Sequence, residues 1–121
     1  MSDHIFDLAV TGNVLFGADV IEGGTVLING GRISGVISST VRFQSRTHLR
    51  AEGKWVLPGV IDSHVHSLSY PGEGLANSTR SAAAGGVTTI IDMPLDVPKG
   101  IATPEALRGK IGLVEKESFV D

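Results

Sequence analysis

The first half of the chain is a series of short runs of β-branched and aliphatic residues, separated by polar and glycine-rich segments. Runs of this length without a helical period are typical of β-strands. The predicted strands cover residues 6–11, 19–21, 25–28, 32–37 and 47–50. With a polar loop at residues 38–45, they predict an antiparallel meander that extends to about Leu57.

Glycine supplies the predicted turns of this meander. Asn29, Gly30 and Gly31 stand between two apolar runs, and both residue types readily adopt the positive φ values of primed hairpin turns. Gly23 and Gly24 are predicted to break the chain between two further strands. The sequence holds 16 glycines in 121 residues, well above the usual share of about 7%. Many tight turns are therefore expected.

The second half of the chain alternates between strand-like and helix-like patterns. Apolar runs at residues 60–61 and 87–91 are typical of buried strands, and residues 74–84 between them are predicted to form a helix rich in small residues. This helix is expected to end at Gly85 and Gly86, because glycine can adopt the left-handed conformation that often follows a helix.

A second helix is predicted to begin near Thr103. Thr103 is a favourable N-cap residue, and Pro104 follows at the first helical position. An apolar stripe is expected at Leu107, Ile111 and Val114, and no strand is predicted after this helix.

The order strand, helix, strand, helix describes two β/α units, the opening of a parallel sheet that helices cover. The predicted fold class is therefore α/β, with a β-rich domain at residues 1–57 and the two β/α units at residues 58–121. A complete (β/α)8 barrel takes about 250 residues. The chain is expected to contain only the beginning of one.

Composition narrows the function classes. Hydrophobic residues make up 41% and charged residues 19%, which is a globular balance. The formal net charge is −3 and there is no basic run, so no nucleic-acid partner is expected. The absence of cysteine excludes disulfides and thiolate metal sites. No apolar run approaches the roughly 18 residues of a membrane span, so a cytoplasmic protein without a membrane partner is predicted.

Two histidines follow the apolar run at residues 60–61. His64 and His66 are spaced i, i+2 on the predicted strand, where alternate side chains point to the same face. Both imidazoles can therefore reach one metal ion, zinc in particular. At the C-terminal end of a barrel strand they would lie where such barrels hold their active sites. By spacing alone, a histidine pair hydrogen-bonded to solvent remains the alternative.

Three blocks of sequence resemble one family. Residues 58–66, Pro-Gly-Val-Ile-Asp-Ser-His-Val-His, resemble the first-strand signature of the amidohydrolase superfamily. Residues 79–95, which end in Asp-Met-Pro-Leu, resemble the second-strand block of its cyclic amidases, the allantoinase, dihydropyrimidinase and dihydroorotase type, and allantoinases most. Residues 6–36 are similar to part of the family's small β-sandwich domain. The resemblance implies the N-terminal part of such an enzyme, a partial β-sandwich followed by an incomplete TIM barrel.

The resemblance also implies a chemistry, the hydrolysis of a cyclic amide or ureide by a hydroxide held between two divalent ions, zinc first. His64 and His66 would be metal ligands. The family's other ligands, a carboxylated lysine, two histidines and an aspartate, have no matching position here. No catalytic residue is therefore expected in this chain, and the isolated chain is expected to be inactive. Lys99, Lys110 and Lys116 are predicted to be solvated surface charges.

Two aspartates near the histidine pair have alternative interpretations. Asp62 lies two residues before His64, and we expect a buried structural hydrogen bond more than a role in tuning the ligands. Asp92 ends the second strand. Contact with the rim of a pocket and simple capping of a loop are equally compatible with its position.

The substrate expectation rests on departures from the family pattern. Dihydroorotases typically carry an Arg after the histidine pair that binds the substrate carboxylate, whereas residues 67–70 are Ser-Leu-Ser-Tyr. Asp96 stands where the family often has Asn. The expected partner is a small-molecule cyclic amide, with allantoin ahead of hydantoins or dihydropyrimidines. A homo-oligomer, as a tetramer, is expected for a full-length protein.

Two further hypotheses belong to other classes. The chain could be part of a non-catalytic interaction protein related to dihydropyrimidinases, although such proteins usually lose the histidine ligands that are kept here. It could also be a degenerate remnant, with an open sheet edge that favours aggregation.

Overall fold

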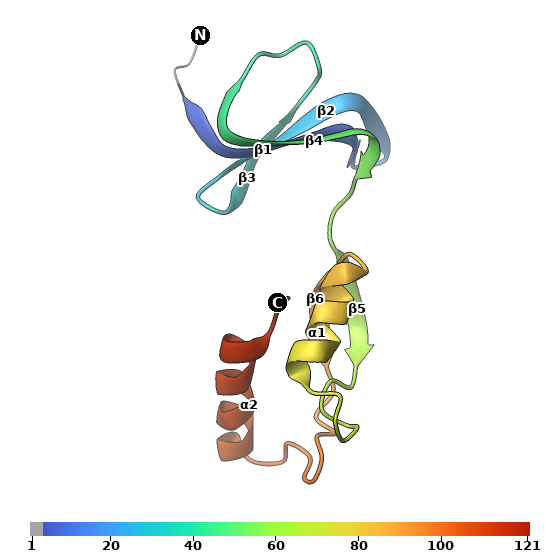
Figure 1. The fold of residues 1–121 in the computed structure, drawn as a ribbon, viewed down its shortest axis with the longest axis vertical. Helices are drawn as coiled ribbons and strands as arrows, with labels where there is room; N and C mark the ends of the chain where they lie inside the picture. The colour runs from blue at the N-terminus through green and yellow to red at the C-terminus, as the bar shows by residue number, and fades with distance from the viewer. Residues whose placement is uncertain (1–3) are drawn as a thin grey trace. The chain divides into compact units, whose positions relative to one another are not determined.

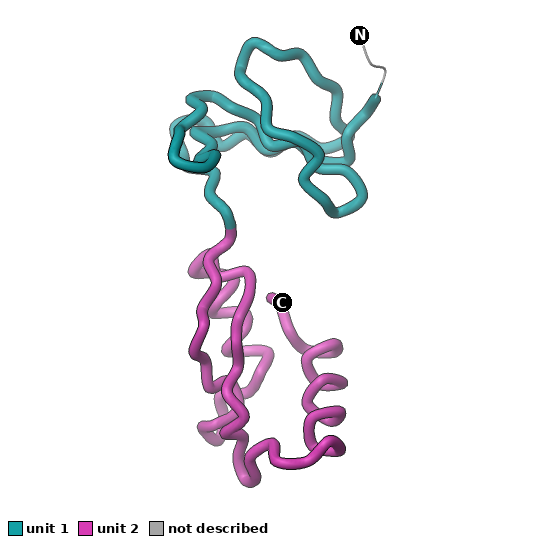
Figure 2. Tube along the Cα trace, turned by 180° about the vertical axis from the view of Figure 1, so that it is seen from behind, with its two compact units in different colours: residues 1–58 teal, residues 59–121 magenta. Residues whose placement is uncertain are grey.

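The computed structural model describes residues 4–121, a mixed α/β chain in which strands predominate (Figure 1). The chain divides between Pro58 and Gly59 into two compact units, unit 1 and unit 2 (Figure 2). Within the described residues, no helix has the length and hydrophobicity needed to cross a membrane.

Unit 1 is a single four-stranded sheet. Its strands are β1 (Ile5–Phe16), β2 (Asp19–Asn29), β3 (Arg32–Ile37) and β4 (Gln44–Val56), in the order β3-β2-β1-β4. β2 pairs antiparallel with both β1 and β3, as the meander predicts. The turn between β2 and β3 is also confirmed, because Gly30 and Gly31 have φ values of 57° and 71°. The buried apolar side chains of this sheet include Ala9 and Leu27.

The predicted break at Gly23 and Gly24 is wrong, because β2 continues through both glycines. The pairing of β1 with β2 shifts register between Gly12 and Val14, and Gly23 has a φ of 60° there. A β-bulge accommodates an extra residue in just this way and leaves the strand pairing intact on both sides. Glycine at this place therefore bends a strand and does not end it.

The predicted meander is also wrong for the last strand of unit 1. β4 pairs with β1, and the two strands run parallel. Antiparallel neighbours can be joined by a short turn, whereas parallel neighbours need a crossover connection. The chain between β3 and β4 provides it, since these two strands lie at opposite edges of the sheet.

Unit 2 has the predicted β/α order. Its elements are β5 (Val60–Val65), α1 (Leu75–Ala84), β6 (Val87–Asp92) and α2 (Pro104–Glu117). β5 and β6 pair in parallel. The predicted N-cap of the second helix is confirmed, because Thr103 Oγ1 accepts a hydrogen bond of 3.2 Å from Ala106 N.

No strand follows α2, as predicted, but the backbone of the last residue, Asp121, contacts β6. Ile90 N donates to Asp121 O at 2.7 Å, and Asp121 N donates to Thr88 O at 3.0 Å. Two hydrogen bonds from one residue to the two neighbours of a facing residue form the bridge of a parallel ladder. β6 is therefore paired in parallel with β5 and is also hydrogen-bonded to the backbone of Asp121.

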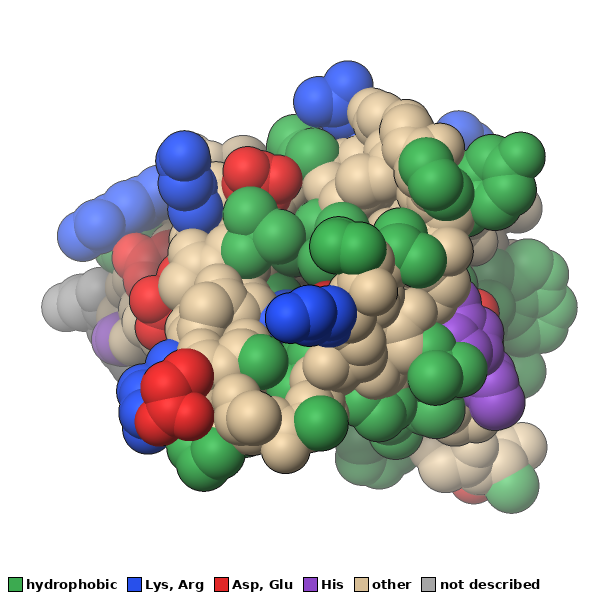
Figure 3. All heavy atoms as spheres, turned by 90° about the horizontal axis from the view of Figure 1, so that it is seen from below, with side chains coloured by type: hydrophobic (Ala, Val, Ile, Leu, Met, Phe, Trp, Pro, Cys, Tyr) green, Lys and Arg blue, Asp and Glu red, His purple; other side chains and the backbone are tan. Residues whose placement is uncertain are grey.

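The apolar stripe predicted for α2 does not face the rest of unit 2. Leu107 and Ile111 are exposed, whereas Lys110 and Leu113 are partly buried. Figure 3 shows hydrophobic side chains standing among polar ones on the surface of the molecule. The exposed apolar residues of β5 and β6 include Val60, Ile61 and Ile91.

Candidate metal centre

The two histidines meet where β5 ends. His64 lies in β5, and His66 directly follows its last residue, Val65. The two Nε2 atoms are 3.0 Å apart and the ring centroids are 5.0 Å apart. His64 is exposed and His66 is half-buried. The structure therefore brings this predicted pair together at an accessible place.

Asp62 acts on the backbone of this pair. Its Oδ1 atom accepts a hydrogen bond of 3.1 Å from His64 N. The side chain is exposed, so the expectation of a buried hydrogen bond is wrong for the described residues. Asp62 is exposed because β6 is the one strand paired with β5 within residues 4–121, so no second neighbouring strand helps to cover it.

The chain after β6 is bonded to the chain after β5. Met93 N donates to Val65 O at 2.8 Å, and Val97 N donates to Leu68 O at 2.9 Å. These bonds lie before and after His66 in the sequence. The backbone that carries His66 is therefore attached to the end of β6.

Asp92, the last residue of β6, holds the residue that follows His66. Its carboxylate accepts hydrogen bonds from Ser67 N, at 3.0 Å, and from Ser67 Oγ. Ser67 is fully buried, with an exposed fraction of 0%. Asp92 thus caps the loop after β5, one of the two roles that the sequence leaves open. Contact with the rim of a pocket stays a prediction.

Lys110 joins this cluster, and its prediction as a solvated surface charge is wrong. Its Nζ atom lies 2.8 Å from Asp92 Oδ2 and 2.7 Å from Asp96 Oδ1, and its side chain is only 9% exposed. The predicted surface positions of Lys99 and Lys116 are confirmed, since both residues are exposed. Lys110 is buried because two carboxylates compensate its charge.

These contacts shift the pKa of both charged groups. Burial raises the pKa of Asp92, but hydrogen bonds from Lys110 and Ser67 outweigh it and hold the pKa below its ordinary value. Burial lowers the pKa of Lys110, but hydrogen bonds to Asp92 and Asp96 outweigh it and raise the pKa.

Unit 2 is expected to lose stability in acid through Asp92. A carboxyl whose pKa is lowered by folding stabilises the fold above its unfolded value, about 3.9, and this contribution is lost as the pH falls through the folded value. Lys110 has the opposite sign, and its contribution is complete below about pH 10.4 and is lost as the pH rises through the raised value.

Urea unfolding at about pH 7 and about pH 2.5 measures how much stability is lost in acid. The Asp92→Asn variant has no titrating group at this position and should lose less stability between the two pH values. An equal loss in both proteins would contradict the assignment to Asp92.

The cluster around Lys110 is not itself a metal site. Within the part of the chain that the structure describes, no group of three or more His, Cys, Asp or Glu side chains is placed to hold a metal ion. The sequence did contain a signal for the ion cluster, because Asp92 ends one strand, Asp96 follows it and Lys110 lies on the next helix. The spacing of the apolar residues on α2 instead predicted that the wrong face of this helix would be buried.

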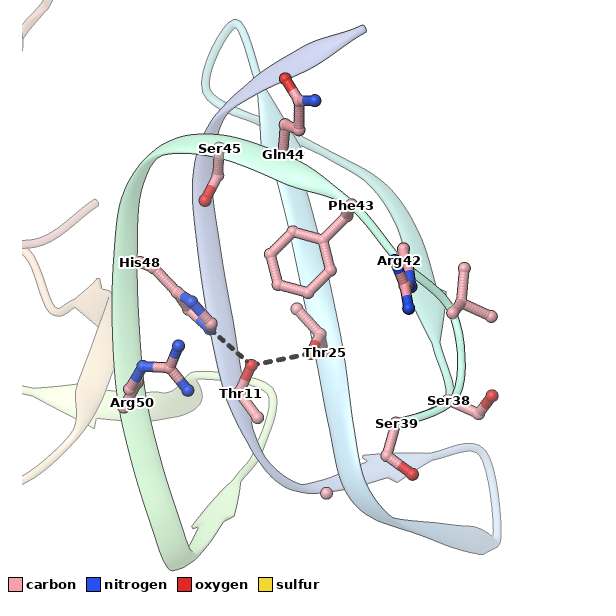
Figure 4. A pocket seen from close by; sticks show the side chains of 12 residues that line it. Thr11, Thr25, Ser38, Ser39, Arg42, Phe43, Gln44, Ser45, His48 and Arg50 are labelled. Carbon is pink, nitrogen blue, oxygen red and sulfur yellow. Dashed lines mark hydrogen bonds between the residues drawn. The ribbon is translucent and has the colours of Figure 1, made fainter. Parts of the chain in front are cut away.

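Unit 1 has a separate recess of about 740 Å³ on its sheet (Figure 4). Thr11 Oγ1 lies 2.7 Å from both Thr25 Oγ1 and His48 Nε2, and the ring of Phe43 packs edge-on against His48. Thr11, Thr25 and His48 thus form one hydrogen-bonded group in this recess.

Proteins with similar sequences are named as enzymes of one kind. The chain is 39% identical over 109 residues to a dihydroorotase from Aeropyrum pernix, covering 87% of this chain and 25% of that protein. It is 36% identical over 123 residues to an allantoinase from Rubrobacter xylanophilus, covering 96% and 26%. The chain therefore spans only about a quarter of the length of these relatives. No family model matches it.

Solved structures of enzymes also resemble this chain. An L-hydantoinase (dihydropyrimidinase) from Arthrobacter aurescens matches 97% of this chain with a TM-score of 0.84 and 29% identity, over 27% of its own length. An N-acyl-D-glutamate deacylase from Bordetella bronchiseptica, solved with zinc and a phosphonate inhibitor, matches 72% of this chain and 18% of its own, with a TM-score of 0.57 and 27% identity. From these matches across both units, the chain belongs to the cyclic amidohydrolases, the hydrolases of cyclic C–N bonds that include allantoinases, hydantoinases and dihydroorotases.

Proposed function

We propose that this chain is part of a zinc-dependent enzyme that opens a cyclic amide or ureide ring, with allantoin as the first candidate substrate. The observation that carries the proposal is the approach of His64 Nε2 and His66 Nε2 to 3.0 Å where a parallel strand ends. Ends of parallel strands are where α/β proteins place their active sites. The similarity to allantoinases and hydantoinases supports the choice of reaction.

The fold part of the proposal concerns what surrounds the two units. We infer that β5, α1, β6 and α2 are the first two β/α units of a (β/α)8 barrel, because Asp121 bonds to β6 as a further parallel strand would. The exposed apolar side chains of β5 and β6 support this inference, since parallel sheets are normally covered on both faces. The sheet of unit 1 would likewise be one layer of a β-sandwich.

The histidine pair fits zinc as a partial donor set. Two imidazole nitrogens on one tetrahedral zinc ion, each at about 2.05 Å, lie about 3.3 Å apart. His64 Nε2 and His66 Nε2 are close to this separation, and a small rotation of either ring gives the remainder. A structural or catalytic zinc site needs three or four protein ligands. The others would come from outside this chain.

When bound, such a metal generates a nucleophile from water at neutral pH and polarises the scissile carbonyl. The residues of this chain would hold and orient it. His64 and His66 would provide two ligands, Asp62 fixes the backbone of His64, and Asp92 fixes the backbone after His66 through Ser67.

The order of candidate substrates follows from the side chains near the pair. A carboxylate substrate such as dihydroorotate calls for a cation, and residues 67–70 contain none. Asp96 is engaged by Lys110 and adds no positive charge. We therefore place allantoin first, hydantoins and dihydropyrimidines next, and dihydroorotate last. The relatives are named as enzymes, which does not favour a non-catalytic interaction protein.

Assay of the full natural protein, loaded with zinc, against these four ring classes tests the proposal. Ring opening of allantoin with the highest kcat/KM is the expected result. A preference for dihydroorotate would overturn the substrate order, and no turnover of any ring would overturn the proposed function. A cytoplasmic location and a homotetramer remain predictions.

Replacing His66 by Ala is expected to weaken zinc binding to the full natural protein by at least about tenfold, because even the loss of a group that only supports a ligand costs this much. Competition with a chromogenic chelator measures the affinity. His48→Ala is the matched control, because His48 lies in unit 1 and bonds to Thr11. Equal zinc affinity of the two variants would count against the proposed site.

A further inference from the structure

Ser69 lies against the ring of His66. The Oγ atom of Ser69 is 3.3 Å from Nδ1 of His66, and Ser69 N donates to His66 O at 3.5 Å in a turn. Nε2 of the same ring is the atom that meets His64. The two nitrogens of His66 therefore face two different partners, Ser69 and His64.

The hydroxyl proton of Ser69 is committed elsewhere. Ser69 Oγ donates to Leu95 O at 2.7 Å. A serine hydroxyl has one proton to donate, and a carbonyl can only accept. Ser69 Oγ is therefore an acceptor toward His66, and Nδ1 of His66 must carry a proton. In a neutral ring, this leaves the lone pair on Nε2, the atom that lies 3.0 Å from His64 Nε2.

The carbonyl group that accepts the hydrogen bond from Ser69 is held in place. Leu95 lies in the segment after β6 that bonds back to Leu68 through Val97 N, at 2.9 Å. The next residue, Asp96, is paired with Lys110 at 2.7 Å. Ser69 thus meets the carbonyl of a residue whose next two neighbours in the chain are both held by contacts.

We propose that Ser69 is a positioning residue that holds His66 in the tautomer with the proton on Nδ1, so that the lone pair of Nε2 points to the space beside His64. The hydrogen bond on one ring nitrogen decides which nitrogen is available to a metal. The tautomer is a property of the chain alone. Only the statement that Nε2 of His66 binds a zinc ion rests on the proposed function.

Nitrogen-15 NMR of the imidazoles in the 121-residue chain tests the proposal without metal, at about pH 8.5, above the range in which imidazoles usually titrate. The expected spectrum shows a protonated Nδ1 and an unprotonated Nε2 for His66. Ser69→Ala should shift both signals toward a mixture of tautomers, and Ser69→Thr, which keeps the hydroxyl, should restore them. Ser63→Ala is the control, because Ser63 points to the other face of β5 and is exposed.

His64 also contacts His66 Nε2 and can influence the tautomer. The unsubstituted chain and the Ser69→Ala variant are therefore also compared after His64→Ala has been added to each. In this second pair, the influence of Ser69 on the tautomer is measured without that of His64. A proton on Nε2 of His66 in the unsubstituted chain, or the same tautomer in both His64→Ala chains, would overturn the proposal. Backbone amide signals of Ser67 and Met93 show whether each variant keeps its fold.

Zinc titration separates this proposal from the proposed function. Ser69→Ala is expected to weaken zinc binding by about tenfold, as the loss of a partner on a ligand histidine typically does. If the tautomer depends on Ser69 but His66→Ala leaves zinc binding by the full natural protein unchanged, the positioning role stands and the metal site fails. If zinc binding depends on His66 while Ser69→Ala leaves the tautomer unchanged, the metal site stands and the positioning role fails.

Discussion

Replacing Lys110 by Met is expected to destabilise unit 2 by about 3 kcal/mol, the lower end of the cost of breaking a buried ion pair. The ammonium group lies between Asp92 and Asp96, whose side chains are only 13% and 14% exposed. Without it, two carboxylates of like charge remain in a site that water reaches poorly. Methionine keeps the length and the apolar stem of the side chain, so the loss reports the charge.

Urea unfolding of the 121-residue chain, followed by fluorescence and circular dichroism, measures this loss. Lys116→Met on the same helix is the control, because Lys116 is exposed, and a change within about 0.5 kcal/mol is expected there. Adding Asp92→Asn to Lys110→Met should recover part of the stability, since one uncompensated charge disappears. Equal stabilities of the Lys110 and Lys116 variants would refute the buried ion cluster.

Replacing Gly59 by Ala is expected to cost about 2 kcal/mol through overpacking. Gly59 precedes β5 and faces β6, where a Cβ atom on Gly59 would lie 2.7 Å from Cβ of Thr88. Carbon atoms pack at about 3.5–4.0 Å. The start of β5 would therefore have to move away from β6, with loss of the hydrogen bond of 3.2 Å from Val60 N to Gly86 O.

The same unfolding measurement on Gly109→Ala provides the control. Gly109 lies within α2, and a Cβ atom there would meet nothing within 4 Å, so this change should be neutral or stabilise by up to about 1 kcal/mol. Adding Thr88→Gly to Gly59→Ala removes the clashing side chain and should relieve the strain between the strands. An unchanged stability of Gly59→Ala would show that β5 and β6 are not in close contact at this place.

Local signals in the sequence predicted much of the fold. β3 has the predicted bounds, Thr103 caps α2, and the two β/α units follow in the predicted order. Each of these features depends on residues that are close together in sequence, such as Asn29 and Gly30 in a turn. Local preference and final structure agree there.

The errors in the fold concern contacts between distant residues. Gly23 looked like a strand end, but pairing with β1 carries β2 through it as a bulge. The direction of β4 depends on which edge of the sheet it reaches, and the polar segment before it does not encode that edge.

The candidate site divides in the same way. The i, i+2 spacing of His64 and His66 was enough to predict that the two rings would meet, because strand alternation is local. The burial of Lys110 was not predictable from α2, since its partners lie on another element. Ser69 was noted as a departure from the dihydroorotase pattern, but its contact with His66 required the turn after β5.

β1 pairs on one side with the next strand in the sequence and on the other side with the distant β4. Joining β1 to β2 closes a short turn, whereas joining β1 to β4 requires closure of a loop that contains the whole of β2 and β3, at a greater entropic cost. Contacts of this second kind also slow folding. The β1–β2 hairpin is therefore expected to assemble first and β4 to dock last, so a newly made chain exposes the free edge of β1 until then, and this edge is where two incompletely folded copies would pair.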